Sequence, residues 1–455
     1  MRRYMNVALD SRLEVLAPAG EMEQLKVAVW HGADAVYLAA KDFGMRSAPA
    51  NFSFEDLTEA VRFAHEHGVK VYQTVNVLPT NAEVEHLEDF LTKSLEAGVD
   101  AIIVSDVGVL MLAKRVVPEL EVHISVQMGV VNFLTARELY ALGAKRVVLA
   151  RELTIEEIST IRKNIPEDME IECFVHGAIC MSISGRCLIS KYFVDRDANH
   201  GECAQPCRWE YDITDPRNPE MKMNVVENMV KDKSGKVVSK GSYILNSKDL
   251  NLIEHIADLS EAGVSSLKIE GRAKSSFYVA SAVNAYRRAV DWHYQNERAN
   301  APLPREILED VQKISHREYT TGFYFAAITS DGAPIEGAFD TDASPGSYFD
   351  KGYKQEWAPA AVKLEDGWHQ RGKFTTPMQL EVLVPKQAKM DVIVQKIYAL
   401  DDVKSRKKGE LLQEPHLLES SAHADQLLAF EFTSIDGTPT IDEFPVGTFL
   451  RMPIL

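Results

Sequence analysis

Short runs of β-branched residues alternate with amphipathic stretches over the first three hundred positions. Eight runs have the length and composition of buried strands; they begin at Leu13, Asp34, Lys70, Asp100, Glu121, Arg146, Met169 and Ser265. Between them, apolar residues recur every three or four positions, as in residues 54–68 and 84–98. No G-x-G-x-x-G follows the first run, which weakens a dinucleotide-binding alternative. The pattern therefore predicts an α/β protein, a parallel (β/α)8 barrel of the TIM-like type.

The pattern changes after the helix predicted at residues 277–295. Strand-like runs separated by Gly, Pro and Asp then follow without helical periodicity, which is typical of a small β-barrel. Between the seventh and eighth strands the chain is far longer than an ordinary βα loop, and that length favours a functional insert. The predicted organisation is a tail at 1–12, a catalytic barrel at 13–298 with a cysteine-rich insert at 177–245, a connector at 299–332 and a C-terminal β-barrel domain at 333–455.

Composition restricts location and partners. Hydrophobic residues make up 45% and charged residues 26%, as in globular proteins. No apolar run reaches the roughly 18 residues that span a bilayer, and the start lacks the features of a secretory signal, so we expect a cytoplasmic protein without a membrane segment. The formal net charge of −17 repels nucleic acid in general, so an RNA partner would need a local basic patch.

All five cysteines lie between residues 173 and 207. Clustered cysteines in a reducing compartment bind metal or perform redox chemistry more often than they form disulfides. The last four, Cys180, Cys187, Cys203 and Cys207, have the spacing C-x6-C-x15-C-x3-C. Zinc sites usually pair cysteines two to four residues apart, so this spacing favours an iron–sulfur cluster while leaving zinc open. Cys173, within a strand, is better interpreted as a buried apolar residue.

Polar residues follow several predicted strands, at the end of a barrel where catalytic groups gather. We identify as candidate catalytic residues Arg151, Glu152, His176, Glu270 and Arg272, and Asn76, Asp106 and Gln127 occupy similar positions. Helix caps and plain salt bridges between the arginines and the glutamates are the competing interpretation. The prediction of a site therefore depends on the whole group of strand-end residues and not on any one of them.

Several segments together carry a family resemblance. They are FVHGAICMSISGRCLIS from Phe174, RDANHGECAQPCRWE from Arg196, NSKDL from Asn246, SLKIEGRAKS on the eighth strand and HREYTTGF from His316. With LAPAG near the start, these resemble the collagenase-like peptidase family U32. The likeness spans the predicted barrel and its connector, whereas the C-terminal domain matches only in outline.

The resemblance implies a barrel enzyme with a [4Fe–4S] cluster on Cys180, Cys187, Cys203 and Cys207 and oxygen-independent hydroxylation chemistry. In the branch that this chain resembles most, prephenate supplies the hydroxyl group and the wobble uridine of tRNA becomes 5-hydroxyuridine. Prephenate is a dicarboxylate, so Arg151, Arg272, Arg186 and Lys268 become candidates for binding it. The electron donor is left open.

An RNA base that enters a pocket must leave its stack, and Tyr192, Phe193 and Trp209 are candidates to receive it. Three alternatives remain. One is a peptidase, as the family label says, although neither H-E-x-x-H nor G-x-S-x-G occurs in the sequence. A second is a hydroxylase of ribosomal RNA or of a quinone precursor. The third is a scaffold whose metal is structural.

Overall fold

A computed structural model describes most of the chain. It covers residues 12–45, 51–183, 186–209, 211, 246–296, 301–325, 353–402, 411–412, 414–421, 425–435 and 444–454, and the backbone of short strands between 213 and 239. Residues 1–11 of the predicted tail and the first twenty residues of the predicted C-terminal domain, 333–352, lie outside the described part. The chain divides into two compact units, and each is described by itself.

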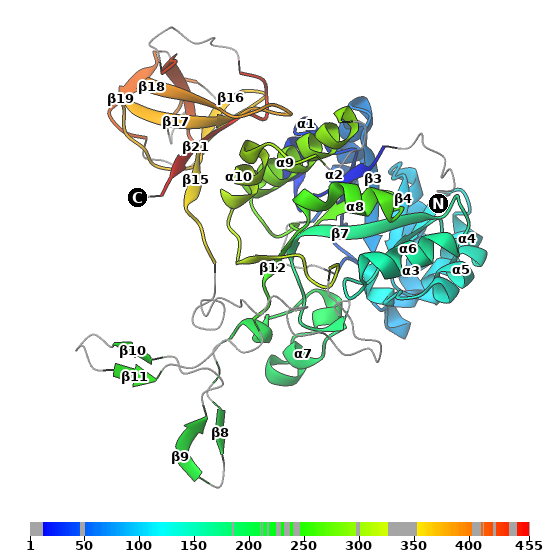
Figure 1. Cartoon of the computed structure of the whole chain (residues 1–455). Coiled ribbons are helices and arrows are strands. Elements are labelled where there is room, and N and C mark those ends of the chain that lie inside the picture. The colour runs from blue at the N-terminus through cyan, green and yellow to red at the C-terminus, as the bar shows by residue number, and fades with distance from the viewer. Residues whose placement is uncertain are drawn as a thin grey trace. The chain divides into compact units, whose positions relative to one another are not determined.

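Eight parallel strands close the first unit's sheet into a barrel, which confirms the predicted (β/α)8 class (Figure 1). The strands are β1 (Glu14–Pro18), β2 (Ala35–Leu38), β3 (Lys70–Val75), β4 (Ala101–Val104), β5 (Glu121–Ile124), β6 (Arg146–Val148), β7 (Glu170–Ala178) and β13 (Ser266–Ile269). Neighbouring strands follow sequence order, and β13 pairs with both β7 and β1. Each strand corresponds to one of the predicted runs.

Helices occupy the connections between these strands. They are α2 (Phe54–Glu66), α3 (Asn81–Glu96), α4 (Val107–Val116), α5 (Phe133–Ala141), α6 (Ile155–Lys163) and α8 (Ile256–Glu261). Capping boxes begin α2, α3 and α6 at Ser53, Thr80 and Thr154. In each box the cap side chain accepts from a first-turn backbone N–H, and an acidic side chain of that turn accepts from the cap backbone N–H. Gly263 after α8 has a φ of +85°, and a Cβ there would collide with Arg162, so glycine suits this turn.

Side chains alternate between the two faces of each barrel strand, so every second residue points inward. On β7, Glu172 and Phe174 point inward, where both lie near Lys268 Nζ, and Cys173 between them points to the opposite face; a bulge interrupts the alternation before His176. Leu16, Ala35, Tyr37, Tyr72, Ala101 and Ile103 form one buried cluster of the interior. The inward residues of β7 therefore follow the interior from the amino-terminal end of the barrel toward its mouth.

Two further strands extend the barrel sheet beside β7. β12 (Asp249–Asn251) pairs antiparallel with the end of β7, and β14 (Tyr319–Thr320) pairs parallel with β12. Between β7 and β12 lie the cysteines and two antiparallel pairs, β8 (Ile213–Asp215) with β9 (Asn218–Met223) and β10 (Met229–Lys231) with β11 (Val237–Ser239). The described backbone of this insert therefore contains two antiparallel strand pairs. No helix among the described residues has the length and apolarity required to cross a bilayer.

The second unit contains a closed antiparallel barrel of six strands, as expected for the C-terminal region. Its order is β17 (Met378–Leu383), β21 (Phe449–Pro453), β15 (Trp357–Leu364), β16 (Gly367–Gln370), β20 (Leu427–Thr433) and β18 (Met390–Ala399), with β19 (His416–Leu418) beside β18. Helices α9 (Ser276–Gln295) and α10 (Arg305–Gln312) and the latter part of α1 (Met22–Trp30) belong to the same unit. Arg451, completely buried, pairs with Asp310 and Glu381 inside it.

Candidate functional site

The four predicted ligands lie on one loop, residues 179–248, which we call the cysteine loop. Cys180 follows the end of β7 by two residues, and Cys187 precedes α7 (Ile189–Val194). Cys207 lies in the short 3-10 helix η4 (Pro206–Arg208), just after Cys203. The backbone N–H of Ala204 donates to the Ser190 hydroxyl at 3.0 Å, which ties α7 to the Cys203 turn.

The thiols of these four residues interact electrostatically. Burial raises the pKa of Cys207, Arg208 opposes that shift, and Cys180, Cys203 and Cys187 each raise it further. These effects require the other three sulfur atoms to lie near that of Cys207. Backbone N–H groups of Ile189 and Gln205 also contact Cys187 Sγ and Cys203 Sγ at 3.4 Å each. Hydrogen bonds of this kind stabilise thiolates that bind a cluster.

The donor set therefore fits a group that takes four thiolates. In the described part of the chain, no three His, Cys, Asp or Glu side chains are already gathered as ligands of a single ion. The fifth cysteine is separate, as its strand position predicted: Cys173 is completely buried on β7, and burial raises its pKa.

Arg151 and Glu270 meet at the mouth of the barrel. Arg151 Nη2 lies 3.9 Å from Glu270 Oε2, and Nη1 donates to the Ala178 carbonyl at 2.9 Å. The Arg151 guanidinium also lies 3.9 Å from the centre of the Phe174 ring. Both charged side chains keep partial exposure, 14% and 18%, so they can reach a bound molecule. Their neighbour Glu152 is half-buried after β6.

His176 is buried at the end of β7, beside the ring of Tyr319. The ring centre of Tyr319 lies 5.5 Å from that of His176, and Tyr319 stacks on His316 at 4.2 Å. A bulge in the β7–β13 pairing lets the Glu270 N–H donate to the His176 carbonyl at 2.9 Å. Bulges of this kind redirect side chains near active sites. The structure thus joins Glu270 to His176 through the backbone and places Arg151 near the Glu270 carboxylate.

Arg272 and Arg186 approach the mouth from other sides. Arg272, 3% exposed, donates to Thr74 Oγ1 at 3.0 Å and to Asn51 Oδ1 at 3.3 Å. Arg186, in the cysteine loop, donates from Nε to the Gln127 carbonyl at 2.5 Å. The loop is therefore attached to the end of β5. Of the other strand-end residues, Asp106 caps α4, which is the competing role considered above.

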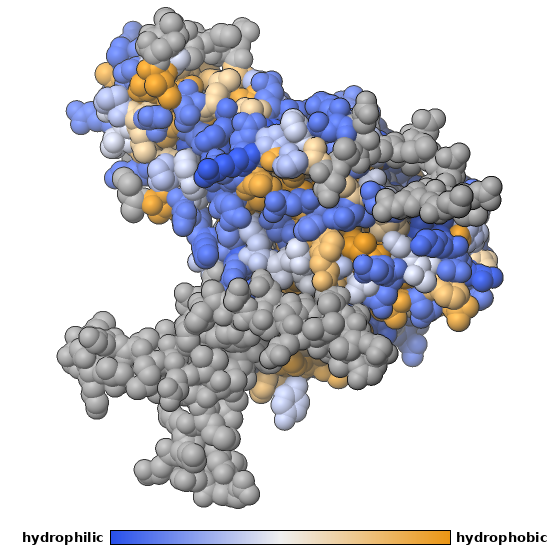
Figure 2. All heavy atoms as spheres, viewed as in Figure 1, coloured by the Kyte–Doolittle hydropathy of each residue, from blue (hydrophilic) through white to orange (hydrophobic). Residues whose placement is uncertain are grey.

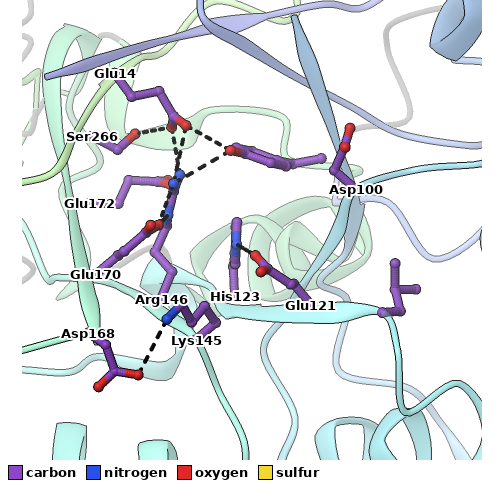
Figure 3. Close-up of polar contacts among 12 residues, drawn as sticks. Glu14, Asp100, Glu121, His123, Lys145, Arg146, Asp168, Glu170, Glu172 and Ser266 are labelled. Carbon is purple, nitrogen blue, oxygen red and sulfur yellow. Dashed lines mark hydrogen bonds and ion pairs between the residues drawn. The ribbon is translucent and has the colours of Figure 1, made fainter. Parts of the chain in front are cut away.

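Lys268 pairs with Glu172, which belongs to a buried charge network inside the barrel. Figure 3 shows Glu14, Arg146 and Glu172 of this network. Its Nζ contacts Glu172 Oε1 at 2.6 Å, and Arg146 Nη1 contacts Glu172 at 3.2 Å and Glu14 at 2.6 Å. Burial opposes the ionisation of Glu172, but Lys268 and Arg146 hold its pKa below the usual range. Lys268 Nζ also lies 5.4 Å from the centre of the Phe174 ring that Arg151 contacts. Its charge is thus balanced within the interior.

Two residues escaped the sequence-based selection. Arg317, 1% exposed, pairs with Asp249 through its backbone N–H and its guanidinium. Tyr319, which contacts His176, lies two positions further along. Asp249, Arg317 and Tyr319 belong to the NSKDL and HREYTTGF segments, which carry the family resemblance. The sequence alone assigned no role to these residues.

The surface around α7 is aromatic and exposed. Tyr192 is 84% exposed, Phe193 52% and Trp209 37%, and the Phe193 ring lies within 6.3 Å of both other rings. Figure 2 shows hydrophobic residues at the place that α7 occupies in Figure 1. Large rings left exposed next to the cysteines indicate a contact surface.

Fold and site together define a (β/α)8 barrel with a four-cysteine loop at its mouth. Peptidase family U32 matches residues 20–332, and the chain belongs to this family. It is 39% identical to tRNA hydroxylation protein P of Escherichia coli over 68% of this chain and 74% of that protein. It is 36% identical to the protein of that name in Helicobacter pylori, over 92% and 94%. Porphyromonas gingivalis has a relative named collagenase that is 30% identical over 92% and 98%.

Proposed function

We propose that this chain is an iron–sulfur enzyme of the cytoplasm that hydroxylates the wobble uridine of tRNA to 5-hydroxyuridine without molecular oxygen, with prephenate as the hydroxyl donor. The observation that carries the proposal is the grouping of four cysteines on one loop at the mouth of a barrel, where the other three thiols raise the pKa of Cys207. The relatives named tRNA hydroxylation protein P support the class of substrate.

Cys180, Cys187, Cys203 and Cys207 would hold a [4Fe–4S] cluster. When bound, the cluster supplies one-electron chemistry that amino-acid side chains cannot perform. Hydroxylation removes two electrons from the uracil ring, and transfer of an oxygen atom from prephenate leaves the donor reduced by two. The donor and the base must therefore be bound next to each other.

Arg151 is suited to hold a carboxylate of prephenate. Its guanidinium is held by the Ala178 carbonyl and the Phe174 ring, so the orientation is fixed before a substrate arrives. The weak 3.9 Å contact with Glu270 would be replaced by a bidentate pair with the incoming carboxylate. Arg186, held at Gln127, would meet the second one. Lys268, already paired with Glu172, would contribute to the local field rather than by direct contact.

The aromatic surface formed by Tyr192, Phe193 and Trp209 would receive bases of the anticodon loop. Unpaired bases stack readily on exposed rings. Stacking depends less on positive charge than contacts to the RNA phosphates do, so it suits an acidic protein. Arg186 and Arg208 add positive charge to the same loop. The surface would therefore serve as the local RNA-binding patch that a chain of net charge −17 requires.

Nothing in the cysteine geometry favours the peptidase alternative. A cysteine nucleophile needs a thiolate, and burial raises the pKa of both Cys173 and Cys207. Ligation of a cluster would also occupy four of the five thiols. Incubation of the anaerobic protein with denatured collagen tests this reading directly, and release of peptides that depends on the intact chain would favour it.

The proposal is tested by digesting tRNA from cells that lack the gene, in a host without another tRNA hydroxylase, and quantifying 5-hydroxyuridine-derived nucleosides. We expect their loss, recovery with the wild-type gene and no recovery with C207S. A block in prephenate synthesis should cause the same loss. Unchanged nucleoside levels in the deletion strain would contradict the proposal, and normal levels without prephenate would contradict the donor.

A further inference from the structure

The two ends of the cysteine loop meet beside each other. Asp249, the first residue of β12, is in antiparallel register with Ala178, the last residue of β7. Ser247 Oγ donates to the carbonyl oxygen of Ile179 at 2.7 Å, across 68 positions of sequence. Ile179 immediately precedes Cys180, so this bond fixes the backbone next to the first predicted ligand.

Arg317 connects the groups that form this base. Its Nε and backbone N–H each contact a different carboxylate oxygen of Asp249 at 3.0 Å. Its Nη1 donates to Asn246 Oδ1 at 2.8 Å and lies 3.4 Å from Ser247 Oγ. Both partners of the ion pair are nearly inaccessible, with 1% exposure for Arg317 and 4% for Asp249. Several charge-assisted bonds from Arg317 therefore reach Asn246, Ser247 and Asp249.

β14 holds Arg317 in this position. Tyr319 pairs in parallel register with Asp249, and the Asp249 N–H donates to the Glu318 carbonyl at 2.9 Å. Arg317, which is distant in sequence from Asp249, is therefore positioned by backbone pairing as well as by its side chain. Buried pairs of this kind fix one arrangement more effectively than they add stability.

We infer that Arg317 and Asp249 are positioning residues that close the base of the cysteine loop and set the place of Cys180 relative to the other three thiols. A long loop loses entropy when its ends are joined, and the Asp249–Arg317 pair selects the joined arrangement before any metal is bound. The inference rests on the proposed cluster as the group that the loop holds.

The effect is specific to one ligand. Cys187, Cys203 and Cys207 lie on the α7 side of the loop, where the Ala204–Ser190 bond joins their segments independently of Arg317. Loosening the base should therefore displace Cys180 and leave the pair Cys203 and Cys207 in place. A purely stabilising ion pair would not single out one cysteine.

Three altered proteins test this. The double variant D249N/R317Q removes both buried charges, and S247A removes only the bond to Ile179. The matched control is D310N/R451Q, which removes another fully buried Asp–Arg pair in the other unit. In metal-free protein, mild oxidation followed by peptide mapping gives the rates of disulfide formation for Cys180 and for Cys203 with Cys207. In protein reconstituted without oxygen, a chelator gives the rate of iron loss.

We expect both loop-base variants to slow crosslinking of Cys180 and to speed iron loss at least about fivefold, the effect of one hydrogen bond. Crosslinking between Cys203 and Cys207 should not change, and the control should lower the melting temperature without altering either rate. Wild-type rates for Cys180 in both variants would overturn the inference, as would an equal change in the control. If wild-type protein takes up no iron, the proposed function fails, while the crosslinking rates still decide whether the pair positions Cys180.

Discussion

The central carbon of the Arg151 guanidinium lies over Phe174, 3.9 Å from the centre of the ring. The same group donates to Ala178, the last residue of β7 before the cysteine loop. Arg151 therefore joins the interior of the barrel to the segment that leads to Cys180, and its orientation is set by the protein before any substrate binds.

Replacing Arg151 with Gln should raise the KM for prephenate roughly 10- to 100-fold, because a charge-assisted bond to a carboxylate is worth about 1.5–3 kcal/mol. R151K keeps the charge but loses the planar fork, so it should recover only part of the affinity. Steady-state kinetics with reconstituted enzyme measure both. R62Q, which breaks an exposed pair with Glu66, is the control and should behave as wild type. A KM that is unchanged in R151Q would remove Arg151 from the donor site.

Cys207 and Cys173 should respond differently to substitution. C207S removes a predicted ligand and should reduce bound iron after anaerobic reconstitution to less than half. C173A alters a buried strand residue outside the site, so it should retain the iron and lose only some stability. Iron analysis and the visible spectrum of each variant provide the measurement. Equal iron contents in the two variants would mean that the ligand set is assigned wrongly.

Substitutions in the aromatic surface should weaken RNA binding specifically. Y192A or F193A should weaken binding of an anticodon stem-loop roughly 5- to 100-fold, since stacking on a ring contributes about 1–3 kcal/mol per base. Fluorescence anisotropy measures this change. L134A on α5 removes a comparably exposed apolar side chain, 61% exposed, and should have no effect. If Y192A and L134A bind alike, the bases stack elsewhere.

Glu14 should make stability depend on pH. Burial opposes its ionisation, yet Arg146 and the hydrogen bonds from Ser266 and Tyr72 lower its pKa from 4.5 to about 2. The unfolded chain therefore binds the proton more readily, so the contribution is complete above pH 4.5 and is lost as the pH falls toward 2. Its size is roughly 3 kcal/mol from the two pKa values.

Urea unfolding of wild type and E14Q over this pH range measures the effect. We expect E14Q to be less stable at neutral pH and the difference to shrink below pH 4.5. E66Q, at an exposed surface pair, should differ from wild type by a few tenths of a kcal/mol at most. A difference between E14Q and wild type that is constant with pH would show that Glu14 acts through packing and not through its charge.

The sequence predicted the barrel because its strands and helices have different hydrophobic periods, and that difference is local information. It missed β16, whose residues GWHQ lack β-branched side chains, and β12 and β14, which are only three and two residues long. Such strands form because a neighbouring strand is already in place, as β7 is for β12.

The candidate site was predictable as a set of positions but not as a set of contacts. Cysteine spacing and strand ends indicated residues at one end of the barrel, since barrel topology brings strand ends together. The pairing of Lys268 with Glu172 depends on the register between β13 and β7, which no local pattern specifies. The pairing of Arg317 with Asp249 spans 68 positions and was invisible for the same reason.

The account depends most directly on the group held by Cys180, Cys187, Cys203 and Cys207. Protein purified and reconstituted without oxygen should contain about four iron and four acid-labile sulfide atoms per chain, with the brown colour of thiolate-bound iron. One zinc ion per chain, or no metal at all, in the same preparation would contradict it.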